Sequence, residues 1–369
     1  MDKGDNKLNT DDILFKANNG IGWIMLNRPE KLNTFSNDMI EKLYGQLSKW
    51  KDDPDIGIIV LEGAGDKAFS AGGDVRQLYD LKDSNVVEYA IESFTREYSM
   101  DMTLHLYPKP ILVYMDGYVM GGGVGVSVAG SHRIVTEKTK WAMPETSIGL
   151  YPDVGASYFM NKMPGCIGRY LALTSKSINA AEALYTGVAD YYIESSLWSD
   201  LKRTIGERKW YNGSADEELH CIISKYNKTP TMDCKIEELE EVVNRHFRFD
   251  RMEDILESLQ GSANEGSEWA NKIVKTILSK SPTSLKVTLK QLVEGKNKSL
   301  RECFMMELAM SINFMKCHDF FEGVRAVLVE KDKAPKWNPQ TLEEVKQEDV
   351  DRFFTYQWKV GENPFGDFK

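Results

Sequence analysis

The sequence lacks the residue groupings that most metal and redox sites need. Its 369 residues include only five histidines and five cysteines, with no C-x-x-C pair and no H-E-x-x-H motif. We therefore expect no metal site and no metal or redox cofactor. The odd number and wide spacing of the cysteines indicate reduced thiols rather than a disulfide framework.

Long apolar runs and an excess of positive charge are also missing. No uninterrupted apolar stretch reaches membrane-spanning length, so we expect no membrane partner. A formal net charge of −10 argues against binding to nucleic acid, although local Lys and Arg can still hold an anionic small molecule. The segment Met1–Asp5 is polar and acidic and resembles neither a secretory signal nor an Arg-rich transit peptide. With the reduced cysteines, it predicts a cytoplasmic protein.

Strand-like and helix-like segments alternate in the first half of the chain. The predicted strands are Gly22–Asn27, Ile56–Glu62, Ile111–Met115 and His132–Thr136. Apolar residues at helical spacing cover Ser36–Trp50, with Ser36 as the expected cap. This alternation predicts an α/β fold with a parallel or mixed sheet covered by helices.

The composition changes after about residue 200, where strand-like runs largely disappear. The segment Glu217–Gln260 is charged and helix-forming, and Phe304–Phe321 carries apolar residues at helical spacing. We therefore expect a core over residues 1–200 that carries the site, followed by a mainly helical region over residues 201–369. The best linker candidate is the small, polar stretch Gly261–Ser267.

The strongest functional signal is the glycine run within Met120–Gly125, which follows a predicted strand. Adjacent glycines let the backbone approach a ligand closely. If a helix begins there, its first amides are unpaired and can hold an oxygen that becomes negative during a reaction. A second glycine turn occurs at Ala68–Asp74. Two such turns, if adjacent in the sheet, can form an oxyanion hole from backbone alone.

Other interpretations of the glycine run are weaker or remain open. A P-loop needs Lys followed by Ser or Thr, and a dinucleotide fingerprint needs a Gly-x-Gly-x-x-Gly spacing, and neither is present. The segment Gly125–Ala129 comes close to a nucleophile elbow around Ser127, which would indicate a serine thioesterase. A glycine-rich helix that packs against a sheet without any ligand is the structural alternative.

Two carboxylates follow the glycine run in the loop Met143–Asp153, namely Glu145 and Asp153. Backbone donors followed by paired acids indicate acyl chemistry. Taken singly, each acid also has a plainer interpretation. Asp153 can be a helix N-cap, Glu145 can be a solvated loop residue, and Glu97 can be a surface residue of a charged helix.

Three segments resemble the enoyl-CoA hydratase/isomerase, or crotonase, superfamily: Ala68–Asp74, Asp116–Gly123 and Pro144–Asp153. Ser281–Lys286, His318–Leu328 and Pro335–Trp337 resemble the C-terminal part of its 3-hydroxyisobutyryl-CoA hydrolase branch. The resemblance implies a crotonase-like fold of stacked β-β-α units with an α-helical C-terminal region. It also implies hydrolysis of a short β-hydroxyacyl-CoA, most simply 3-hydroxyisobutyryl-CoA in valine degradation.

The resemblance implies a role for five residues. The amides of Gly73 and Gly122 would form the oxyanion hole. Glu145 would act as general base on water or attack the thioester directly to give an anhydride. Asp153 would position the substrate's hydroxyl or assist proton transfer, and Glu97 would contact the acyl group.

The sequence departs from the superfamily pattern at one position, and the resemblance also implies a binding region for CoA. Hydratases of the superfamily use a second glutamate that would fall at Gly125, which places alkene hydration in doubt. CoA, as part of the substrate, would lie near Arg28–Leu32, including Lys31, and near Ala71. A hydratase or isomerase of the same fold, a serine thioesterase using Ser127 and a non-catalytic CoA-binding protein remain alternatives. A homo-oligomer is also expected from the resemblance.

Overall fold

The computed structural model describes residues 11–210, 213–358 and 365. The polar segment Met1–Asp5 lies outside these described residues. A six-stranded sheet in the order β1-β2-β3-β5-β7-β9 forms the main layer, with β1 antiparallel to β2 and the other neighbours parallel. Its strands are β1 (Ile13–Asn18), β2 (Ile21–Leu26), β3 (Ile58–Gly63), β5 (Ile111–Met115), β7 (His132–Val135) and β9 (Tyr191–Tyr192).

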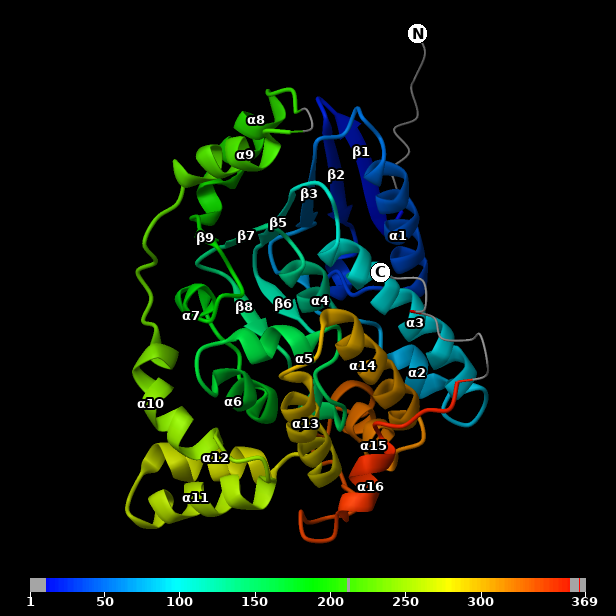
Figure 1. Ribbon diagram of the computed structural model, residues 1–369, viewed down its shortest axis with the longest axis vertical. Coiled ribbons are helices and arrows are strands. Elements are labelled where there is room, and N and C mark those ends of the chain that lie inside the picture. Colours follow the sequence, from blue (N-terminus) through cyan, green and yellow to red (C-terminus); the bar gives the residue numbers. More distant parts are fainter. Residues whose placement is uncertain (1–10, 211–212, 359–364, 366–369) are drawn as a thin grey trace.

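Helices cover both faces of this sheet (Figure 1). The covering helices are α1 (Asn37–Lys51) on one face and α8 (Trp198–Gly206) with α9 (Ala215–Ser224) on the other. Successive side chains of β3 point in opposite directions, as the strand geometry requires. Ile58 and Val60 pack with α8 and α9, whereas Ile59 and Leu61 pack with α1. This two-sided burial explains why β3 is apolar throughout.

A second, smaller sheet has three parallel strands in the order β4-β6-β8. They are β4 (Ala68–Ser70), β6 (Tyr118–Met120) and β8 (Lys140–Ala142). Three-residue strands next to glycines show no periodicity that a sequence pattern can detect, so this sheet was not expected. Because its strands are parallel, the segments that follow them meet at one edge.

The remaining elements of the N-terminal part surround this edge. The helices are α2 (Arg76–Asp80), α3 (Val86–His105), α4 (Gly122–Val128), α5 (Ala156–Phe159), α6 (Ile167–Thr174) and α7 (Ala180–Tyr185). Short 3₁₀ turns are η1 (Pro29–Lys31), η2 (Glu145–Ile148), η3 (Met160–Lys162) and η4 (Ser195–Leu197). Ser36 caps α1, as the sequence predicts, and Asn179 opens α7 with a capping box.

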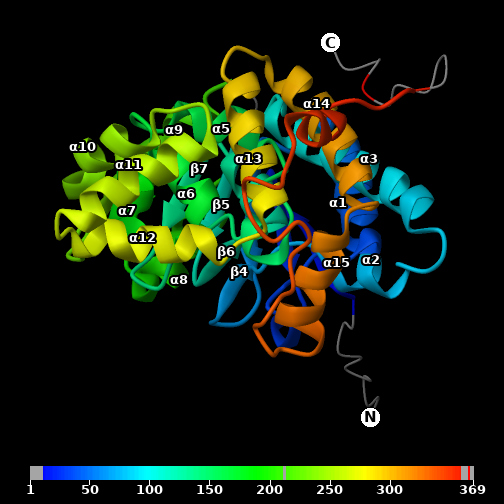
Figure 2. The ribbon, with the colours of Figure 1, turned by 90° about the horizontal axis from the view of Figure 1, so that it is seen from below.

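The C-terminal part is mainly helical over the residues that the structure describes, and an irregular segment joins Val329 to Gln347. Its elements are α10 (Lys235–Phe247), α11 (Met252–Asn264), α12 (Glu268–Leu278), α13 (Pro282–Gly295), α14 (Leu300–Phe314), α15 (His318–Val324), a π-helical turn (Arg325–Val329) and α16 (Gln347–Arg352). Figures 1 and 2 both place α10 to α12 on the side of the molecule away from α1 and α3. By contrast, α14 packs against α3 and α5, so the C-terminal region reaches the edge of the small sheet.

Three expectations about the C-terminal half need correction or stay predictions. The predicted linker Gly261–Ser267 is wrong, because α11 continues to Asn264 and Ser267 already caps α12. Its small polar residues form the last turn of α11 and the short connection to α12, where composition alone resembles a linker. Phe304–Phe321 spans two helices rather than one. The domain boundary near residue 200 stays a prediction, and α8 runs across it while packing on the main sheet.

Candidate active site

Two backbone amides converge at the edge of the small sheet. Gly73 follows β4 and Gly122 follows β6, and a Cβ built on Gly122 would lie 3.3 Å from the Gly73 nitrogen. Gly122 is the first residue of α4, so its amide has no acceptor within the helix. Around Gly73, the Phe35 amide donates to Gly72 and the Asp74 amide donates to Phe35, which leaves the Gly73 amide outside this pairing.

Glycine at position 121 allows the Glu145 side chain to lie next to the two amides. Gly121 has φ +52 and ψ −124, a conformation that residues with a side chain rarely adopt. A Cβ at this position would lie 2.9 Å from Oε1 of Glu145, so the carboxyl packs directly against the Gly121 backbone. Glu145 follows β8 and opens the turn η2. The three parallel strands therefore bring Gly73, Gly122 and Glu145 together.

Glu145 is buried but keeps one unengaged carboxyl oxygen. Its side chain is 6% exposed, and Oε2 has no hydrogen-bond partner among the described residues. Burial raises the pKa of Glu145 well above its usual range, and the nearby Asp153 raises it further. The interpretation of Glu145 as a solvated loop residue is therefore excluded by its burial.

Asp153 lies beside this carboxyl and is 7% exposed. Its Oδ2 accepts a hydrogen bond from the Tyr98 hydroxyl at 2.9 Å. Burial raises the pKa of Asp153 to about 6, while the bond from Tyr98 counteracts part of this effect. The side chain does not cap α5, whose N-cap residue is Gly155 without a side-chain bond. The N-cap interpretation is therefore wrong.

The turn after Asp153 is strained and is held from the C-terminal region. Val154 has φ +50, which is unfavourable for a β-branched residue. The fully buried carboxylate of Glu307 on α14 accepts bonds from the Gly155 and Ser157 amides at 2.7 and 2.8 Å. Glu307 thus fixes the backbone that orients Asp153.

Glu97 on α3 stands at the mouth of the two-amide site and is partly buried. Its Oε1 lies 2.8 Å from the Cβ position built on Gly122 and 3.9 Å from that on Gly73. Burial, followed by the proximity of Asp153, raises the pKa of Glu97 to about 8. All five residues that the sequence analysis places at the reaction centre therefore lie together; their roles stay predictions.

Comparison with known proteins covers nearly the whole chain. Residues 21–354 match the family model described as enoyl-CoA hydratase/isomerase. The chain belongs to this family. The 3-hydroxyisobutyryl-CoA hydrolase, mitochondrial, of Gallus gallus is 41% identical over 350 residues, covering 93% of this chain and 88% of that protein. The protein of the same name from Homo sapiens is 38% identical over 348 residues, with coverage of 93% and 88%.

Solved structures of this family confirm the crotonase-like fold. A carnitinyl-CoA dehydratase from Mycobacterium thermoresistibile has a TM-score of 0.85 and 32% identity, covering 94% of this chain and 97% of that one. An enoyl-CoA hydratase from Rhodobacter sphaeroides has a TM-score of 0.84 and 28% identity, with coverage of 93% and 97%. Both span the helical C-terminal region as well as the core.

In this member of the enoyl-CoA hydratase/isomerase family, neighbouring side chains fill the space beside Gly125. A Cβ on Gly125 would lie 2.6 Å from Cβ of Val154 and 3.1 Å from Oδ2 of Asp101. The space that a side chain at position 125 would need is therefore occupied, and a glutamate does not fit there without rearrangement.

Sequence reasoning missed two buried acids of this family member, Asp101 and Glu307. Asp101 is 1% exposed, and neither carboxyl oxygen has a hydrogen-bond partner within the described part of the chain. Its position four residues after Glu97 puts both on one face of α3, which was a usable signal. Glu307 gave only the weaker signal of a charge inside an apolar helical run.

The expected CoA end of the site lies beside the η1 turn. The Ala71 amide donates to the carbonyl of Leu32 at 2.9 Å, which joins the segment after β4 to the end of this turn. A cavity of about 260 Å³ lies next to it, lined by residues that include Pro29, Asn33 and Lys67. Lys31 is exposed at the end of η1. The proposed contacts of Lys31 and Ala71 with CoA stay predictions.

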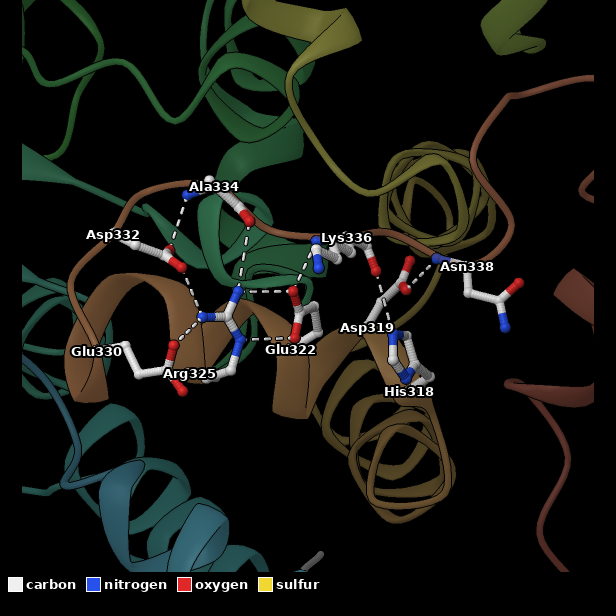
Figure 3. A network of polar contacts seen from close by, with 9 residues as sticks. All are labelled: His318, Asp319, Glu322, Arg325, Glu330, Asp332, Ala334, Lys336 and Asn338. Carbon is white, nitrogen blue, oxygen red and sulfur yellow. Dashed lines mark hydrogen bonds and ion pairs between the residues drawn. The ribbon is translucent and has the colours of Figure 1, made fainter.

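The C-terminal region also clamps the turn that carries Glu145, through the segments around Asp319 and Asn338. The buried Asp319 accepts hydrogen bonds from the Ser281 hydroxyl at 2.5 Å and the Asn338 amide at 2.7 Å. The backbone of Asp319 packs directly on Gly149, which ends η2. Arg325 joins Glu322, Glu330 and Asp332, as Figure 3 shows, and so fixes the segment that returns to Asn338.

This clamp yields a stability prediction. Asp319→Ala leaves the Ser281 hydroxyl and the Asn338 amide without their acceptor, which should cost about 1–3 kcal/mol of unfolding free energy for each group. Glu330→Ala is the matched control, since an exposed ion pair contributes below about 1 kcal/mol. Urea unfolding of both variants measures the difference. Equal stability of the two variants would contradict the clamp.

Proposed function

We propose that this protein hydrolyses the thioester of a short β-hydroxyacyl-CoA, with 3-hydroxyisobutyryl-CoA as the favoured substrate. The observation that carries the proposal is the buried Glu145, which has an unengaged oxygen beside two converging amides while position 125 holds no acid. The names of the relatives at about 40% identity support the same substrate. Such a reaction would serve valine degradation.

The amides of Gly73 and Gly122 would bind the thioester oxygen and stabilise the negative charge that it acquires. In one route, Glu145 takes a proton from water as the water attacks the carbonyl carbon. In the other, Glu145 attacks, the CoA thiolate leaves, and water opens the resulting anhydride. Both routes give one acid and one CoA thiol, and the geometry is compatible with each.

Asp153 supports proton transfer in either route. Burial raises the pKa of both Asp153 and Glu145, and their mutual repulsion disfavours two negative charges. The two carboxyls are therefore biased toward sharing one proton, and with Glu145 as the charged partner the proton on Asp153 can be delivered to the leaving thiolate. Substrate binding would exclude water from the site, so that the proton passes between the carboxyl pair and the thiolate rather than to solvent.

The hydratase alternative has less support from this site. Adding water across a double bond needs an acid and a base on matched sides of the substrate. Val154 and Asp101 fill the space at Gly125 where the family's second glutamate would stand. Glu145 therefore has no such partner at that position.

The serine thioesterase alternative needs a base beside Ser127, and the described residues place none in hydrogen-bond contact with its hydroxyl. Ser127 is fully buried in α4, and its hydroxyl donates to the carbonyl of Val124 at 3.0 Å. Among the residues that the structure describes, no histidine forms a hydrogen bond with it. The Ser127 hydroxyl therefore has a structural role within α4.

Ser127→Ala should therefore keep at least about half of the parent turnover, because the removed bond only reinforces α4. Thiol release from 3-hydroxyisobutyryl-CoA measures this. Labelling of the parent by a fluorophosphonate probe at Ser127, together with loss of turnover in the variant, would establish the serine route instead.

We propose further that CoA enters only as part of the substrate and that no metal or redox cofactor takes part. No group of His, Cys, Asp and Glu within residues 11–210, 213–358 and 365 has an arrangement that could hold a metal ion. Over the same ranges, no helix has both the length and the apolarity to cross a membrane. Oligomeric state stays a prediction.

The cellular compartment needs its own experiment. The sequence predicts a cytoplasmic protein, whereas the names of the relatives from Gallus gallus and Homo sapiens contain the word mitochondrial. These names place the cytoplasmic prediction in doubt. Cell fractionation with an antibody against the chain decides between the two compartments.

The proposed activity is tested with a panel of acyl-CoA thioesters and detection of free thiol, with and without a chelator. We expect the highest kcat/KM for 3-hydroxyisobutyryl-CoA and no effect of chelation. Absence of thiol release from every short acyl-CoA would overturn the proposal.

A further inference from the structure

A small cavity of about 40 Å³ opens beside the converging amides. Gly73 and Glu97 line it on the side of the reaction centre, and Phe35, Leu78 and Phe94 supply apolar wall. Pockets that hold drug-sized ligands span roughly 300–1,000 Å³. This cavity therefore has room for only a few atoms, which suits the end of a short acyl group rather than CoA.

A chain of hydrogen bonds runs along the polar wall of this cavity. The Ser93 hydroxyl donates to Oδ1 of Asn37 at 2.7 Å. Nδ2 of Asn37 donates to the Tyr89 hydroxyl at 2.9 Å, which in turn donates to Oε1 of Gln77 at 2.7 Å. These hydrogen bonds join α3, α1 and α2, and each group donates to the next. The Ser93 hydroxyl proton is therefore used in the bond to Asn37, while the Ser93 oxygen can still accept a hydrogen bond.

Glu97 complements this acceptor. It lies one helical turn after Ser93 on α3, so both side chains project from the same face into the cavity wall. The pKa of about 8 keeps the Glu97 carboxyl protonated at neutral pH, because burial disfavours its charged form. A protonated carboxyl is a hydrogen-bond donor.

We propose that Ser93 and Glu97 together bind the β-hydroxyl of the acyl group in this cavity, Ser93 as acceptor and Glu97 as donor. A hydroxyl is the small group that can donate to one partner and accept from the other at once. Ser93 is then a specificity-determining residue, and Asp153 remains free for proton transfer. This inference rests on the proposed thioester hydrolysis.

The energetic consequence is discrimination against acyl groups without the hydroxyl. An unsubstituted acyl chain would leave the Glu97 proton and the Ser93 oxygen unpaired in a partly buried wall. A site built to pair with a hydroxyl rejects the analogue without it more strongly than an apolar pocket rejects a change in length. Isobutyryl-CoA, which differs from the favoured substrate only by that hydroxyl, is the matched probe.

The experiment compares Ser93→Ala with the parent on 3-hydroxyisobutyryl-CoA and isobutyryl-CoA. We expect kcat/KM for the hydroxylated substrate to fall about tenfold, as for loss of one hydrogen bond, and that for isobutyryl-CoA to change less than about twofold. Ser93→Thr retains the hydroxyl and should restore the preference. Ser99→Ala, on the same helix but outside the cavity lining, controls for general effects on α3.

The outcomes separate the inference from the proposed function. An equal fall on both substrates, or an unchanged ratio, would show that Ser93 only supports the fold and would overturn the inference while thiol release continues. Absence of thiol release by the parent from either substrate would overturn the proposed function and the inference together.

Discussion

Replacing Glu145 by glutamine should reduce thioester turnover by about 10²–10⁴-fold, because an amide is neither a base nor a nucleophile. The two side chains have the same shape, and among the described residues Oε2 of Glu145 has no hydrogen-bond partner that the substitution would disturb. Turnover of 3-hydroxyisobutyryl-CoA measures the effect. Glu88→Gln, an exposed change on α3, is the matched control. Turnover near the parent value in Glu145→Gln would remove this residue from the reaction.

The same variant has a second, independent readout in stability. The folded-state pKa of Glu145 is raised, so the folded protein holds this proton more tightly than the unfolded chain. The parent should therefore lose stability as pH rises from the usual range of a glutamate through the raised folded pKa. Glu145→Gln lacks this loss and should be at least as stable as the parent at neutral pH. Urea unfolding across the pH range tests the slope.

Gly122→Ala should lower kcat/KM strongly. The expected loss of transition-state stabilisation is about 2–4 kcal/mol, as for the loss of one oxyanion donor. A Cβ at this position would lie 2.8 Å from Oε1 of Glu97 and 3.3 Å from the Gly73 nitrogen, inside the space meant for the thioester oxygen. Gly122 does not have a positive φ, so the helix itself accepts alanine. The variant should therefore fold but turn over slowly.

Gly45→Ala provides the control, since the Cβ that it adds on α1 would meet no atom within 4 Å apart from its chain neighbours and the backbone of its own helix. Helix propensity predicts that this control keeps full activity with slightly higher stability. Cooperative thermal unfolding shows whether each variant is folded. A folded Gly122→Ala protein with turnover close to the parent would exclude the Gly122 amide from the oxyanion hole.

The sequence predicted those parts of the fold whose signals are local. The Ser36 cap and the apolar face behind it lie within one helix, and the central strands are apolar because both faces are buried. The small sheet could not be predicted this way, because each strand has three residues and gains stability only from its neighbours. The stretch Gly261–Ser267 misled because the end of a helix with its connecting turn has the same small, polar composition as a linker.

The candidate site was predicted to the extent that motifs carry it. Gly73, Gly122 and Glu145 each follow a strand of the small sheet, so their proximity depends on a topology that the sequence suggests only through resemblance. Asp101 and Glu307 were missed because their importance arises from packing. Glu307 lies on α14, more than a hundred residues from the Asp153 turn that it holds.

The most direct test of the account follows one substrate that both family chemistries can consume. Parent protein is incubated with 3-hydroxyisobutyryl-CoA, and the products are separated by chromatography and then identified and quantified by mass spectrometry. Thioester hydrolysis predicts equal amounts of 3-hydroxyisobutyrate and free CoA, lost together in Glu145→Gln. Formation of the dehydrated, unsaturated acyl-CoA without free thiol would contradict the account and establish a hydratase-type reaction at this site.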